Sequence, residues 1–114
     1  MKSLKKTMIA ITILLSTTIA GAQIKNAKTE TVKIYGNCGM CETKIEKAGN
    51  LKNIAKVDWN VDTKMATLTY DSTRTNQSEI LKKIALAGYD SEKIKAKTED
   101  YFNLPGCCQY DRVK

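Results

Sequence analysis

Apolar and polar residues alternate along three stretches of the chain, and this period of two predicts half-buried β-strands. The stretches are residues 30–35, 57–61 and 66–70. Only the polar residues 62–64 and Met65 separate the last two stretches, so they predict a β-hairpin. A shorter alternation over residues 93–97, with lysine at every second position, predicts a fourth strand at the edge of the sheet.

Two further stretches carry apolar residues at helical spacing. Cys41, Ile45 and Ala48 would share one face of the first helix. The second helix is predicted to follow Asn76, a capping residue, and to end at Gly88. The resulting order, β-α-β-β-α-β, predicts a ferredoxin-like α+β fold, a four-stranded antiparallel sheet with both helices on one face.

The N-terminal residues have the pattern of a cleavable secretory signal peptide. Three lysines precede an apolar stretch over residues 8–15, and the small residues Ala20-Gly21-Ala22 follow. Because the apolar stretch is shorter than the ~20 residues that cross a bilayer, we expect cleavage after Ala22 and no stable membrane insertion. The mature protein is then periplasmic or secreted.

The rest of the chain divides into three predicted parts. Residues 23–29 form a flexible leader, 30–97 a single domain and 98–114 a C-terminal extension with a short helix. The full chain has 114 residues. The 92 that remain after cleavage (114 − 22) suit one small core, and we expect a monomer.

Composition excludes several classes of function. The chain has no histidine, which removes Cys/His zinc fingers and histidine-based catalysis. The formal charge is +7, but lysine and glutamate are interspersed rather than gathered into a basic stripe, so nucleic-acid binding is not expected. No nucleophile-elbow serine or convergent pair of acids stands out, and we expect the protein not to be an enzyme.

The four cysteines form two close pairs, Cys38 with Cys41 and Cys107 with Cys108. Structural disulfides in small exported domains usually join distant parts of the sequence, so close pairs favour a metal site or thiol exchange. Cys41 lies where the first helix begins, and free N–H groups and the helix dipole favour a thiolate there. Two thiolates at this spacing suit a soft ion such as Cu(I) or Hg(II).

With a strand before Gly36, Cys38 and Cys41, and Ala87-Gly88-Tyr89 ending the second helix, residues 30–97 resemble the heavy-metal-associated domain family. The resemblance implies a metallochaperone or scavenger whose ligands are Cys38 and Cys41, with Tyr89 bordering the site. It also implies delivery to an acceptor such as a metal-transporting membrane ATPase. Cu(I) is the leading ion, and Hg(II), Zn(II) and Cd(II) are alternatives.

Two features depart from the family pattern. Gly36 stands where the family usually has a methionine, and Met40 lies between the two cysteines. Packing is the expected role of Met40, and a thioether ligand to Cu(I) is the alternative. The second departure is the extension that carries Cys107 and Cys108. The predicted last strand runs away from the metal loop, so the extension must turn back to reach it.

The residues after Lys97 can make that return, because ten residues with one helical turn span ~20 Å, about a short strand. We therefore expect Cys107 or Cys108 to add a third or fourth thiolate, which would favour scavenging over delivery. Two other hypotheses remain for Cys107 and Cys108. The pair could form an independent exposed soft-metal or redox patch, or one of them could form a disulfide with a cysteine of the loop.

Two alternatives from other classes also remain. Thioredoxin-like oxidoreductases place a C-x-x-C motif between a strand and a helix as well, so a periplasmic thiol-disulfide oxidoreductase is the main rival. Those folds need a proline that faces the motif, whereas Pro105 is the only proline and lies near Cys107. In the second alternative, the four cysteines form two structural disulfides.

Overall fold

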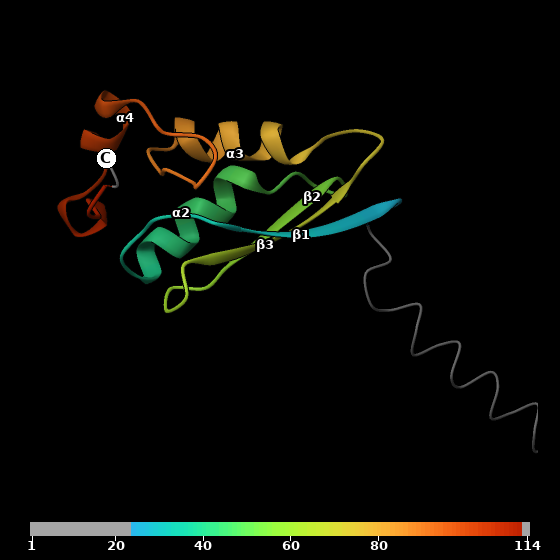
Figure 1. Cartoon of the computed structure of the whole chain (residues 1–114), viewed down its shortest axis with the longest axis horizontal. Coiled ribbons are helices and arrows are strands. Elements are labelled where there is room, and N and C mark those ends of the chain that lie inside the picture. Colours follow the sequence, from blue (N-terminus) through green and yellow to red (C-terminus); the bar gives the residue numbers. More distant parts are fainter. Residues whose placement is uncertain (1–23, 113–114) are drawn as a thin grey trace, which may run out of the picture.

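The computed structural model describes residues 24–112 (Figure 1). The predicted signal peptide, residues 1–22, lies outside the described residues. Within residues 24–112, no helix combines the length and the apolar character that crossing a membrane requires.

A three-stranded antiparallel sheet forms the base of the domain. Its strands are β1 (Ala27–Lys33), β2 (Ala55–Trp59) and β3 (Met65–Asp71), in the order β1-β3-β2. The β2-β3 hairpin is as predicted, and β1 begins three residues earlier than the alternation predicts. One face of the sheet is buried because the period of two brings its apolar residues together there. These buried residues are Val32, Ala55, Val57, Trp59, Ala66, Leu68 and Tyr70.

Helices α2 (Gly39–Gly49) and α3 (Gln77–Leu86) cover this face (Figure 1). As predicted, Asn76 caps α3, and its side chain accepts a hydrogen bond from the backbone N–H of Glu79 at 2.9 Å. Gly49 allows α2 to lie close to the sheet, since a Cβ there would come within 2.5 Å of Val57 Cγ2.

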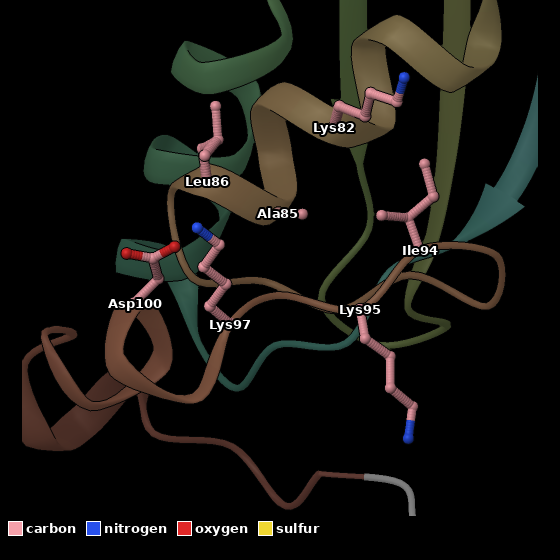
Figure 2. Close-up of a pocket in the computed structure, with 7 residues that line it drawn as sticks. All are labelled: Lys82, Ala85, Leu86, Ile94, Lys95, Lys97 and Asp100. Carbon is pink, nitrogen blue, oxygen red and sulfur yellow. The ribbon is translucent and has the colours of Figure 1, made fainter.

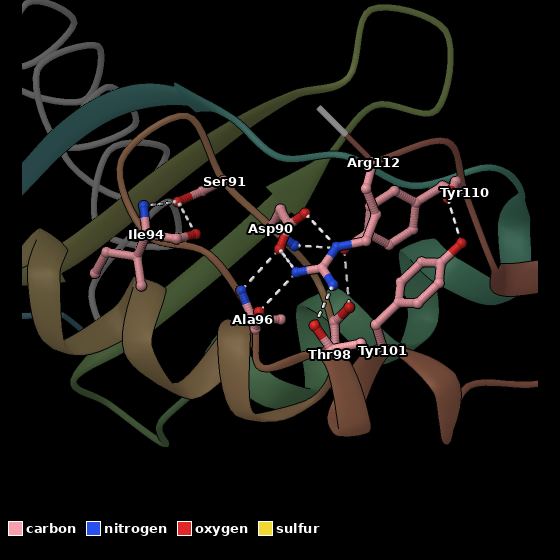
Figure 3. Close-up of polar contacts among 9 residues, drawn as sticks. Asp90, Ser91, Ile94, Ala96, Thr98, Tyr101, Tyr110 and Arg112 are labelled. Atoms are coloured by element: carbon pink, nitrogen blue, oxygen red, sulfur yellow. Dashed lines mark hydrogen bonds and ion pairs between the residues drawn. The ribbon is translucent and has the colours of Figure 1, made fainter. Parts of the chain in front are cut away.

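The fourth strand predicted over residues 93–97 is not found among the described residues. An isolated bridge between Ile34 and Ser91 joins this part of the chain to the sheet edge. Side chains take the N–H groups that a strand ladder would need (Figure 3): Ser91 Oγ accepts from Ile94 N at 3.0 Å, and Asp90 Oδ1 accepts from Ala96 N at 2.7 Å. The alternation in the sequence instead reflects the burial of Ala96 and the partial burial of Ile94.

The C-terminal extension turns back against the end of α3. It contains α4 (Thr98–Phe102) and the short 3-10 helix η1 (Gly106–Cys108). Gly88 makes the close approach possible, because its φ is +107° and a Cβ there would lie 2.7 Å from the carbonyl oxygen of Asp100.

We expect Gly88→Ala to lower the free energy of unfolding by about 1–3 kcal/mol, because alanine disfavours this φ and its methyl group would collide with α4. Urea unfolding of the reduced protein measures the change. Gly106→Ala is the matched control: a Cβ there meets nothing within 4 Å, and the expected change is within about 0.5 kcal/mol. Equal stabilities for the two variants would contradict this account.

Candidate metal centre

The loop between β1 and α2 presents the first two cysteines. Cys38 is the N-cap residue of α2 and Cys41 lies in its first turn, with their Sγ atoms 3.7 Å apart. Cys41 is fully buried, whereas Cys38 is partly exposed. Gly36 packs against the ring of Trp59, which a Cβ would approach to 3.0 Å. The Trp59 ring therefore leaves little room for a side chain at position 36.

Cys108 reaches the same point from the extension. The Sγ atoms of Cys38, Cys41 and Cys108 all lie within 4.8 Å of one another, and Cys108 is fully buried. Three thiolates around one ion at ~2.3 Å lie ~4.0 Å apart, so a small closing movement would bring these sulfurs to metal-binding distance. The structure thus brings together three of the four cysteines proposed as ligands.

The fourth, Cys107, lies outside this three-sulfur cluster. Its side chain is exposed, and its Sγ is 3.9 Å from Cys108 Sγ and 3.8 Å from Met40 Sδ. Its backbone is held at the loop, because the Cys107 carbonyl accepts a hydrogen bond from Asn37 Nδ2 at 3.4 Å and faces Cys38 Sγ at 3.7 Å. All four cysteines are free thiols in this structure.

The environments of the thiols differ. The backbone N–H of Cys41 contributes most to lowering the pKa of Cys38, and the Cys41 side chain lowers it further against the opposing effect of burial. Burial raises the pKa of Cys108 to about 12. Of these two thiols, Cys38 forms the thiolate more readily, and Cys108 would lose its proton on binding a metal ion.

Tyr89 borders the cluster, as the family resemblance implies. Its side chain is fully buried, and among the described residues its hydroxyl has no hydrogen-bond partner. Burial, followed by the neighbouring thiols of Cys41 and Cys108, raises the pKa of this hydroxyl. A buried hydroxyl without a partner is costly, and a metal-bound thiolate would accept its hydrogen bond. The donor set therefore fits a thiolate-bound ion.

A group of polar contacts that we call the clamp, formed by Asp90, Tyr110 and Arg112, fixes the end of the extension. The Tyr110 hydroxyl donates to the Gly88 carbonyl at 2.9 Å and accepts from the backbone N–H of Asp90 at 2.7 Å. Arg112 makes two hydrogen bonds of 2.9 Å to the Asp90 carboxylate (Figure 3). Since η1 ends only two residues before Tyr110, the clamp also positions Cys108.

The clamp contains a buried charge that is well compensated. Burial opposes ionisation of Asp90, but the hydrogen bonds from Arg112 and from the Ala96 N–H outweigh it and keep the pKa of Asp90 below its usual value. Tyr110 and Arg112 were not identified from the sequence. No local pattern marks them, because their partners lie about twenty residues away.

A separate hollow of about 260 Å³ lies between α3 and the segment that leads into α4 (Figure 2). Its lining is mostly apolar, although three lysines contribute to it. No sulfur atom lines it, so it is distinct from the cysteine cluster. The lining residues are Lys82, Ala85, Leu86, Ile94, Lys95, Lys97 and Asp100.

The chain is similar to known metal-binding proteins in sequence and in fold. Residues 31–90 match the model of the heavy-metal-associated domain. The chain is 32% identical, over 66 residues, to the periplasmic component of the mercuric transport protein of Pseudomonas aeruginosa, covering 56% of this chain and 72% of that protein.

Two solved structures share the fold. The CopZ metallochaperone has a TM-score of 0.53 at 26% identity, and the match covers 56% of this chain and 98% of CopZ. Oxidised MerP from Ralstonia metallidurans CH34 has a TM-score of 0.53 at 31% identity, covering 58% of this chain and 94% of MerP. Each match spans little more than half of this chain.

We expect Tyr110→Phe to expose Cys108, because the change leaves the Gly88 carbonyl and the Asp90 N–H without their buried partner, at a cost of about 1–3 kcal/mol. In a Cys107→Ser background, alkylation of Cys108 in the apo protein should accelerate roughly 5- to 150-fold, as followed by peptide mass spectrometry. Tyr35→Phe, outside the clamp, is the control. Unchanged labelling of Tyr110→Phe would show that the clamp does not hold Cys108.

Proposed function

The chain belongs to the heavy-metal-associated domain family, and from this membership we propose that it binds a soft metal ion through Cys38, Cys41 and Cys108. One observation carries the proposal: three sulfur atoms from two distant parts of the sequence lie within 4.8 Å of one another. Thiolates bind soft ions strongly.

The ligand set favours Cu(I). Cu(I) and Hg(II) accept two or three thiolates without further ligands, whereas Zn(II) and Cd(II) prefer a tetrahedral set. The fourth thiol, on Cys107, is exposed and lies beside Cys108 but outside the group of three, which makes Zn(II) and Cd(II) weaker candidates. Among relatives, one is named for mercuric transport, so Hg(II) is the closest competitor as cargo.

The burial of the site supports a scavenger more than a rapid carrier. Cys41 and Cys108 are fully buried, so release requires the extension to move. In this proposal residues 30–97 are the metal-binding domain and 98–114 close it. The relatives are described as transport or chaperone proteins, which supports a role without catalysis. A thioredoxin-like oxidoreductase loses its main support, because the C-x-x-C motif lies in a different fold.

We also propose that the protein is exported and acts in the periplasm or outside the cell as a monomer. The support is the signal-peptide pattern of residues 1–22 and a relative described as a periplasmic component. An acceptor such as a metal-transporting membrane ATPase would take the ion by thiolate exchange.

Replacing Cys108 should weaken Cu(I) binding far more than replacing its neighbour. Cys108→Ser is expected to lower the affinity about 100-fold or more, since even a lost hydrogen-bond partner of a metal ligand costs about 10- to 100-fold. Cys107→Ser, the matched control, should keep the wild-type affinity. Competition with a chromogenic Cu(I) chelator under anaerobic, reducing conditions measures both. Equal affinities for the wild type and Cys108→Ser would remove the extension from the site.

The identity of the ion is tested on the exported protein. Purified without oxygen and analysed by mass spectrometry, it should carry one copper ion per chain. One mercury or zinc ion in its place would overturn the choice of Cu(I).

A further inference from the structure

Two sulfur-containing side chains lie at the surface beside the buried cluster. Met40 is 50% exposed, in the first turn of α2, and Cys107 is exposed in η1. Their sulfur atoms are 3.8 Å apart, although 67 positions separate them in the sequence. The buried centre uses neither of them.

The distance between these two sulfurs suits a shared ion. Two sulfur ligands, each ~2.3 Å from one ion, lie at most ~4.6 Å apart. A thioether and a thiolate are both soft ligands, and Cu(I) is the ion that such a pair selects. Packing does not explain the pair well, because methionine contributes to packing through buried contacts and half of Met40 faces solvent.

The pair is continuous with the buried centre. Cys107 Sγ lies 3.9 Å from Cys108 Sγ, which belongs to the three-sulfur cluster. A line of sulfur atoms therefore leads from solvent at Met40, through Cys107, to Cys108. Cys41 and Cys108 are fully buried, so a free ion has no direct approach to two of the three inner ligands.

The same elements fix the outer pair and the inner centre. Met40 directly precedes Cys41, and the Cys107 carbonyl is held by Asn37 Nδ2 at 3.4 Å. The backbones that carry the outer sulfurs are thus held beside the inner ones.

We propose that Met40 and Cys107 form an outer Cu(I) site through which the ion enters the buried centre, an inference that rests on the proposed function. In the first exchange a Cu–S bond forms to Cys108, whose thiol gives its proton to water, and the Cu–S bond to Met40 breaks. In the second, Cu–S bonds form to Cys38 and Cys41, whose thiols lose their protons to water, and the Cu–S bond to Cys107 breaks, leaving a thiolate that takes up a proton from water. Copper stays monovalent throughout, so the step needs no oxidant or reductant.

Stopped-flow transfer of Cu(I) from its coloured bicinchoninate complex to the apo protein tests this site. Met40→Leu keeps the apolar side chain and removes the thioether, and Cys107→Ser removes the thiol. Each should slow uptake by about tenfold or more. The double variant should be no slower than the slower single variant, because both sulfurs serve one site. Met65→Leu, at an exposed methionine of β3, should take up Cu(I) at the wild-type rate.

The outcomes separate the two proposals. If the wild type takes no Cu(I) from the chelator, the proposed function itself fails. If the wild type binds one ion tightly and both Met40→Leu and Cys107→Ser take it up at the wild-type rate, the outer site alone is overturned. Slowing in only one of the two variants also overturns it, because the site requires both sulfurs.

Discussion

The buried carboxylate of Asp90 is the constraint on which the metal-binding end of the molecule depends. Asp90 is 2% exposed, and a buried charge is tolerated only when it is paired and hydrogen-bonded. Its two oxygens bind Arg112 and the backbone N–H of Ala96. The first contact ties down the extension. The second takes an N–H group that the predicted edge strand would have used, so the same side chain both holds the extension and contributes to the loss of that strand.

This arrangement converts an open two-cysteine loop into an enclosed centre. Once Arg112 and Tyr110 are fixed, η1 lies over the start of α2, and Cys108 meets Cys38 and Cys41. The aromatic rings fill the space between, with Tyr89 and Tyr110 stacked at a centroid distance of 5.8 Å. Enclosure buries the thiols of Cys41 and Cys108 and leaves the Tyr89 hydroxyl beside them as a donor. The extension is therefore part of the proposed site rather than an appendage to it.

Local rules were enough to predict the central part of the fold. The period of two identified β2 and β3, the capping residue Asn76 located the start of α3, and the position of Cys41 at a helix start followed from its spacing. The family resemblance added Tyr89. These features depend on neighbours in the sequence, or on a motif that is contiguous.

Other features depended on long-range contacts and could not be predicted in the same way. The alternation over residues 93–97 has the pattern of an edge strand, yet Asp90 and Ser91 take its N–H groups. Chain length showed that the extension could return, but only the direction of each side chain in η1 distinguishes Cys108, which points inward, from Cys107, which points outward. The partners of Tyr110 and Arg112 lie about twenty residues away, so neither residue stands out in the sequence.

In the proposed site, the clamp also affects how tightly the ion is retained, because Tyr110 of the clamp contacts Cys108. The Tyr110 N–H donates to the Cys108 carbonyl at 2.9 Å, so a tight turn joins the two residues. Cys108 cannot withdraw from the cluster without moving this turn, and moving the turn strains the Tyr110 hydroxyl contacts with Gly88 and Asp90. If Cys108 holds the ion, release to an acceptor must offset the loss of these buried hydrogen bonds as well as of a metal–sulfur bond. An acceptor that supplied only one replacement thiolate would therefore receive the ion slowly. Slow release is the behaviour of a protein that retains its ion.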